Sequence, residues 1–93
     1  MSSSVGLLDF FVLEASEYLE RLDGIVAAAG DGTPDFDAFT GYARRLRGSS
    51  TMARLSSLSE VAAGVERMGR ALRDGVIGWN ADVRGAIVAA IDD

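Results

Sequence analysis

The sequence predicts an all-α fold, arranged as an antiparallel up-down-up-down four-helix bundle. Apolar residues recur at helical spacing in four segments, and no β-type alternation or internal repeat interrupts them. Short connections separate these segments, which favours antiparallel packing of neighbouring helices. A chain of 93 residues with 48% hydrophobic content can bury one core, so we assign residues 1–93 to a single domain.

The first predicted helix covers about residues 5–29 and ends at the Gly-Asp-Gly sequence of residues 30–32. Thr33 and Pro34 then start the second helix as its N-cap and first helical residue, because proline fits the first turn. The inward-facing residues of the first helix are Leu8, Phe11, Ala15, Tyr18, Leu19, Leu22, Ile25, Val26 and Ala29. Those of the second are Phe36, Phe39, Ala43, Leu46, Ser50 and Ala53.

The second helix is expected to stop near Leu55, and Ser57 and Glu60 are expected to form a capping box for the third helix. An Asp-Gly pair at residues 74–75 closes the third helix, and Asn80 caps the fourth. The predicted apolar positions of these two helices are Leu58, Val61, Ala62, Val65, Met68, Leu72, Val83, Ile87, Ala90 and Ile91. The connection residues expected to plug one end of the bundle are Val76, Ile77 and Trp79. We expect the interior to contain Leu22, Phe39, Leu46, Val61, Val65 and Ile87.

The net charge of −5 is unevenly distributed along the chain. Residues 1–37 contain eight acids and one arginine (−7), residues 38–73 seven arginines and two acids (+5), and residues 74–93 four acids and one arginine (−3). Either acidic and basic helices neutralise each other within the fold, or the basic centre selects an acidic partner surface. We expect no nucleic-acid binding, because the chain is acidic overall and no aromatic residues interleave with the arginines.

Several kinds of site are excluded or not expected. The chain has no cysteine and therefore no disulfide or thiolate metal site. No run approaches the ~20 apolar residues that span a bilayer, and no signal peptide is visible, so we expect a cytoplasmic protein without a membrane partner. We expect neither cofactor nor metal, since the sequence lacks a Gly-rich phosphate loop, a metal-ligand cluster and a Ser-His-Asp or Cys-His set.

One face of the second helix has an unusual composition. Arg44, Arg47, Gly48 and Thr51 share it, at the spacing of neighbours on a helix surface. A glycine in an exposed helix interior costs roughly 1 kcal/mol, which is understandable if a partner must approach the backbone closely. We therefore interpret this face as a docking surface.

The same segment carries a family resemblance. Residues 43–50, Ala-Arg-Arg-Leu-Arg-Gly-Ser-Ser, resemble the Ala-His-x-Leu-Lys-Gly-Ser motif of histidine-containing phosphotransfer (HPt) domains, and most of all the N-terminal domain of chemotaxis histidine kinases. In that family the histidine receives a phosphoryl group from a kinase and passes it to an aspartate of a receiver domain. Arg47 and Gly48 match the lysine and glycine, which assist the phosphoryl group and clear space for the partner. Arg44 stands in place of the histidine, and the chain contains no histidine at all.

The resemblance extends over nearly the whole chain and implies an HPt-like bundle. Glu66 matches a family glutamate that hydrogen-bonds the phospho-accepting ring, whereas Ala63 stands where a second histidine is common. In this chain Glu66 is expected to pair with Arg44 or Arg47. Arg54 replaces a frequent glycine, which bears on access to the site. Many relatives have a fifth helix, so we expect the chain to be the N-terminal part of a longer protein.

Arginine cannot accept a phosphoryl group, because its guanidinium stays protonated and offers only donors. Ser49, Ser50 and Thr51 have no evident general base and are expected to serve packing and helix solvation. We therefore expect no enzyme, but a non-phosphorylatable HPt-like domain that docks a receiver or histidine-kinase domain as a regulator or adaptor. The residues expected to bind the partner are Arg44, Arg47, Gly48, Thr51, Arg54 and Glu66.

Two other functions stay open at this point. The chain could be a structural or oligomerisation bundle, with self-association and no signalling partner at this face. It could also be a true phosphotransferase that uses a non-histidine acceptor.

Overall fold

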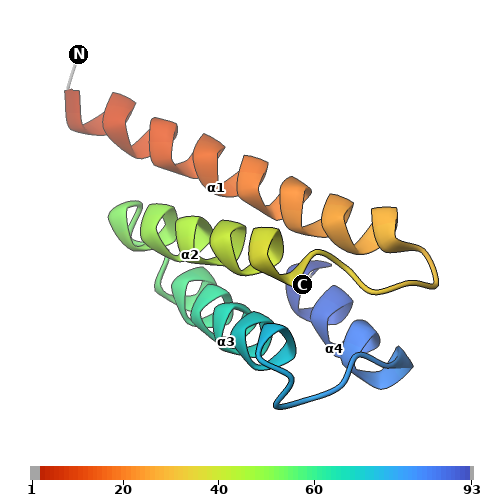
Figure 1. The fold of residues 1–93 in the computed structure, drawn as a ribbon. Coiled ribbons are helices and arrows are strands. Elements are labelled where there is room, and N and C mark those ends of the chain that lie inside the picture. The colour runs from red at the N-terminus through yellow and green to blue at the C-terminus, as the bar shows by residue number, and fades with distance from the viewer. Residues whose placement is uncertain (1–2, 93) are drawn as a thin grey trace.

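In a computed structural model the chain forms four α-helices, which confirms the all-α four-helix class (Figure 1). The structure describes the backbone of residues 3–92 and the side chains of residues 6–92. Within this range there is no β-strand, and none of the helices is both long enough and apolar enough to cross a bilayer. The helices are α1 (Ser3–Ala29), α2 (Phe36–Met52), α3 (Ser56–Arg73) and α4 (Ala81–Asp92).

Helices α1, α2 and α3 lie side by side, with α2 in the middle (Figure 1). Glu14 contacts Ser49 and, one turn further along α1, Tyr18 contacts Tyr42, so the chain runs in opposite directions in α1 and α2. The chain also reverses between α2 and α3, because Thr51 contacts Ser59 whereas the earlier Thr40 contacts the later Gly69. The shorter α4 packs against both α1 and α3. A strict up-down-up-down order that includes α4 stays a prediction.

The core forms where the apolar stripes of the four helices meet. Its buried hydrophobic residues are Ala15, Leu22, Val26, Phe39, Ala43, Leu46, Ala62, Val65, Leu72, Ile87 and Ile91. Five of the six residues predicted for the interior are among them. Val61 is the exception: it is exposed at the edge of an apolar groove that it lines together with Met68 and Ala90. The prediction for Val61 was wrong because helical spacing does not reveal how far the neighbouring helix covers a face.

The N-terminal end of α1 is also less covered than predicted. Leu8 belongs to the apolar stripe by spacing, yet it is exposed. At 1.5 Å per residue, the 27 residues of α1 span about 40 Å and the 17 residues of α2 about 25 Å. The first turns of α1 therefore lack the cover that α2 gives to Ala15 and Leu22.

Helix α2 begins two residues later than predicted. Asp35, not Thr33, is its N-cap, and Asp35 Oδ1 accepts a hydrogen bond from the Ala38 backbone amide at 3.1 Å. Pro34 is buried but lies before the helix. The carboxylate of Asp35 satisfies one of the free amides of the first turn, which is why the cap forms there.

The end of α2 and the start of α3 are determined by one tight turn. Arg54 N donates to Thr51 O and Leu55 N donates to Ser50 O, which is the Schellman pattern. Arg54 has φ 60°, a left-handed conformation that favours glycine. Helix α2 consequently stops at Met52, earlier than expected, and α3 follows after a three-residue connection.

The predicted capping box of Ser57 and Glu60 is wrong. Leu55 occupies the N-cap position of α3 and makes no side-chain capping bond. Because the Schellman turn already places Leu55, the helix starts at Ser56, two residues too early for Ser57 to be its N-cap.

The connection between α3 and α4 is partly as predicted. Asn80 Oδ1 accepts a hydrogen bond from Val83 N at 2.9 Å, which confirms the cap of α4. Trp79 is half-buried and packs on Phe36 with ring centroids 5.8 Å apart, as expected for a residue that closes one end of the bundle. Val76 and Ile77 are exposed, so they do not contribute to this plug.

Candidate functional site

The candidate site lies on the outer surface where α2 and α3 meet. Because Phe39, Ala43 and Leu46 are buried, the helical repeat turns Arg44 and Gly48 towards solvent. The sequence prediction of an exposed Arg44 is confirmed.

Glu66 is the centre of this site. It projects from α3 and is only 3% exposed, whereas buried carboxylates are rare unless they are paired. Arg47 Nε donates to Glu66 Oε1 at 2.7 Å, and Arg44 Nε donates to Glu66 Oε2 at 3.4 Å. Arg70 also donates to Glu66 Oε2 from one turn further along α3. We call these four residues the arginine cluster.

The arginines keep Glu66 ionised. Burial by itself would raise the pKa of Glu66, but the hydrogen bond and charge of Arg47, the charge of Arg70 and the hydrogen bond of Arg44 outweigh it. The pKa of Glu66 is therefore lower than its ordinary value of 4.5.

Three guanidinium groups share one carboxylate, so the cluster carries a net charge of +2. The side chains of Arg44, Arg47 and Arg70 are 61%, 42% and 45% exposed. Each guanidinium has five N–H donors, of which Glu66 takes only a part. An acidic group that approaches from solvent can therefore bind the remaining donors.

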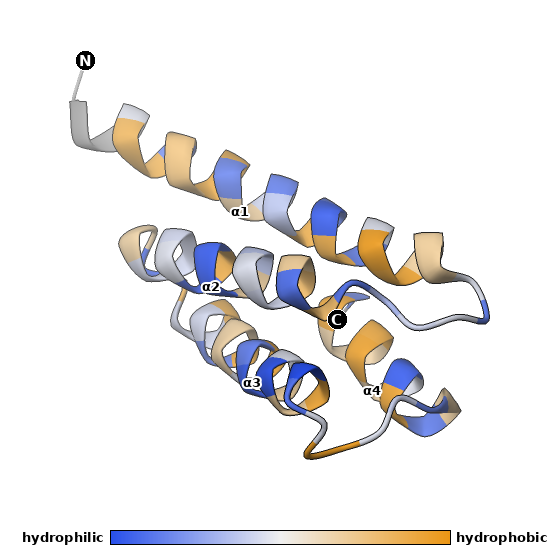
Figure 2. Ribbon diagram, in the orientation of Figure 1, coloured by the Kyte–Doolittle hydropathy of each residue, from blue (hydrophilic) through white to orange (hydrophobic). Residues whose placement is uncertain are grey.

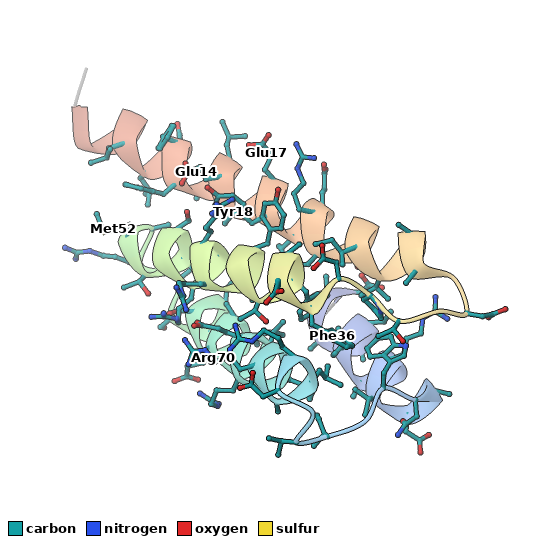
Figure 3. All side chains as sticks on the ribbon, in the orientation of Figure 1. Glu14, Glu17, Tyr18, Phe36, Met52 and Arg70 are labelled. Carbon is teal, nitrogen blue, oxygen red and sulfur yellow. The ribbon has the colours of Figure 1, made fainter. Side chains whose placement is uncertain are left out.

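Arg70 is the member of the cluster that the sequence analysis missed. It lies on α3 at the junction with α2 (Figure 3). The signal was present in the sequence, because Glu66 and Arg70 have the i, i+4 spacing of a favourable helix pair.

Gly48 lies next to the cluster and is open to solvent. A Cβ atom at this position would have no other atom within 4 Å, apart from the local helix. No packing within the described residues thus requires glycine here, in contrast to Gly69 on α3. The backbone of α2 at Gly48 is therefore open to solvent.

The other expected site residues are placed less favourably. The Thr51 hydroxyl donates to the Arg47 carbonyl at 2.8 Å and pairs with the Ser59 hydroxyl at 2.8 Å, so it ties α2 to the start of α3. Arg54 is exposed, but it lies in the connection after α2 and not within the cluster. Ala63 is half-buried on α3.

Ser49 and Ser50 face the protein interior. Ser49 is buried and its hydroxyl donates to Glu14 Oε1 at 2.7 Å, which links α2 to α1 (Figure 3). Ser50 is fully buried. Residues 6–92 contain no group of three acidic side chains that could hold a metal ion.

Comparison of the chain with protein-family models, with curated proteins and with solved structures finds no match. The HPt resemblance accordingly rests on the motif in residues 43–50 and on the position of Glu66, whereas Arg54 departs from the family pattern.

Proposed function

We propose that this chain is a non-phosphorylatable HPt-like domain that docks an acidic receiver or histidine-kinase domain and acts as a regulator or adaptor in phosphorelay signalling. The observation that carries the proposal is the arginine cluster around buried Glu66, next to the open Gly48. Two of its arginines, Arg44 and Arg47, lie in the segment that resembles the HPt motif.

The chemistry of the cluster suits binding without transfer. Arg44 occupies the acceptor position and offers donors but no nucleophilic lone pair. Glu66 holds the guanidinium groups in place before a partner arrives, which reduces the entropy lost on binding. The receiver domains that bind HPt domains surround their phosphorylation site with carboxylates. Guanidinium groups bind carboxylates through charge-assisted hydrogen bonds.

The test measures binding of receiver domains from the same genome by calorimetry over a series of salt concentrations. We expect the affinity to fall as salt rises and Arg47→Glu to weaken binding by about tenfold or more. Arg73→Glu is the matched control, because Arg73 pairs with Asp37 and Asp74 outside the cluster. Binding that is indifferent to salt and to Arg47→Glu would rule out docking through the cluster.

Gly48→Ala separates shape from charge. The added methyl group meets no atom of the described fold beyond the local helix. Because alanine favours a helix more than glycine does, we expect the free energy of unfolding to rise by up to about 1 kcal/mol. If the partner approaches the backbone at Gly48 closely, the same variant should bind more weakly. Unchanged affinity would mean that the partner does not reach Gly48.

A further inference from the structure

The N-terminal end of α1 presents an apolar surface that the fold leaves uncovered. Figure 2 shows hydrophobic residues over most of this end of the helix. Phe10 is 53% exposed and Leu13 is 69% exposed. We call this surface the apolar end; it consists of the exposed Leu7, Leu8, Phe10, Val12 and Leu13 and the half-buried Phe11.

The apolar residues of this segment point in all directions around the helix. By helical periodicity Leu8 and Phe11 continue the core stripe of α1, whereas Phe10 and Leu13 lie on its opposite side. A helix that is hydrophobic all round is normally buried. The fold of a single chain cannot bury the apolar end, because α2 reaches only one side of α1 and stops at Met52.

Met52 enlarges the apolar surface. Met52 is 60% exposed and lies at the end of α2 that is next to the N-terminal part of α1 (Figure 3). The apolar end and Met52 together expose on the order of several hundred Å², which is at the upper end for a monomer. A standard interface buries about 800 Å² on each partner, so this surface could supply a large part of one half of an interface.

We propose that the apolar end binds a second copy of this chain, forming a two-fold symmetric dimer through antiparallel contact of the two α1 ends. Two identical apolar helix ends are self-complementary, as an isologous interface requires. Each end would supply the cover that the other lacks.

The charge distribution of α1 supports a second copy in this orientation. Residues 6–13 carry one charge, Asp9, so two acidic chains can meet here with little repulsion. Residues 14–23 contain four acids and one arginine. Parallel pairing along α1 would bring these acidic halves together, whereas antiparallel pairing of the apolar ends directs them away from each other.

This dimer is separate from the arginine cluster. The α1 contact uses none of Arg44, Arg47, Glu66 and Arg70, so each dimer would carry two copies of the arginine cluster. Two linked sites raise the apparent affinity for a dimeric or clustered partner without any new contact. Dimerisation does not depend on the proposed docking function and can be tested alone.

The experiment determines the molar mass of the full chain by light scattering and sedimentation up to about 100 μM, which detects weak association. We expect a dimer for the wild type and a monomer for the double variant Phe10→Glu, Leu13→Glu. The control is Val76→Glu, which charges an exposed apolar residue in the α3–α4 connection and should leave the dimer intact. Circular dichroism should show equal helicity in all three proteins.

Cross-linking tests the geometry. The chain contains no cysteine, so Leu13→Cys introduces a single thiol. Under oxidation this variant should form a disulfide-linked dimer much faster than Val76→Cys does. A wild-type monomer at the highest concentration overturns the proposal, and so does a dimer that survives the double glutamate variant. Equal cross-linking at both positions also overturns it.

Discussion

At the scale of single residues, Glu66 decides what the candidate site can be. A buried carboxylate would be costly by itself, but three arginines neutralise it and are in turn held by it. The HPt resemblance predicted that Glu66 would pair with Arg44 or Arg47, and both pairs are present. The third partner, Arg70, makes the cluster more basic than the motif alone indicated.

Replacement of Glu66 tests this network through its pH dependence. Because the pKa of Glu66 is lower in the folded chain, its ionised form stabilises the fold above about pH 4.5, and this contribution disappears as the pH falls through the folded pKa. Glu66→Gln should therefore lower the free energy of unfolding by about 1–2 kcal/mol at neutral pH, a moderate value because the arginines are partly exposed. The difference from the wild type should shrink as urea unfolding is measured towards pH ~3.

Glu60→Gln is the control for this experiment, because Glu60 is exposed on the same helix. We expect it to change the free energy of unfolding little at any pH. If the loss for Glu66→Gln is as large in acid as at neutral pH, the ionised carboxylate is not what stabilises the cluster.

At the scale of helices, the packing of α2 against α3 depends on Gly69. A Cβ atom at this position would lie 2.6 Å from Thr40 Oγ1 and 3.1 Å from the Phe39 ring. Both of these residues are buried, so they have little room to move. Gly69 thus permits the close approach of the two helices that form the arginine cluster.

Gly69→Ala should therefore destabilise the fold. Alanine gains up to about 1 kcal/mol in helix propensity, but overpacking a buried contact costs about 1–3 kcal/mol, so we expect a net loss of about 1 kcal/mol in chemical denaturation. Gly64→Ala on the same helix is the matched comparison, because its nearest atom is an Arg67 nitrogen at 3.8 Å. We expect that variant to be more stable than the wild type. Stabilisation by both substitutions would mean that the helices do not meet closely at Gly69.

At the scale of the whole molecule, α4 meets α1 at a point where two acids face each other. Burial, together with the charge and hydrogen bond of Asp92, raises the pKa of Asp23 above its ordinary value of 3.8. The folded state therefore disfavours the ionised form of Asp23. This repulsion acts between residues that are 69 positions apart in the sequence, and only the fold brings them together.

Asp23→Asn should raise the melting temperature at neutral pH by removing this repulsion. Since the folded pKa is raised, the penalty exists above it and is relieved as the pH falls through it, so the gain should vanish in acid. Thermal unfolding of wild type and variant at several pH values measures this effect. Glu20→Gln removes one charge from the same helix and serves as the control. An equal gain for both variants would indicate a general effect of net charge.

The sequence by itself determined the four helices, most of their buried residues, the cap at Asn80 and the face that carries Arg44, Arg47 and Gly48. These features depend on helical periodicity and on capping side chains, which act over a few neighbouring residues. They are therefore visible in the order of residues alone.

Only the tertiary structure decided where α2 begins and ends, that three arginines bind Glu66 together, and which apolar residues stay uncovered. Val61 and Leu8 have the same helical spacing as buried residues, but the neighbouring helices do not extend far enough to cover them. Arg54 adopts the left-handed conformation because the turn between α2 and α3 requires it. Coverage and turn geometry depend on the lengths and positions of elements that are distant along the chain, and periodicity within one helix carries no information about them.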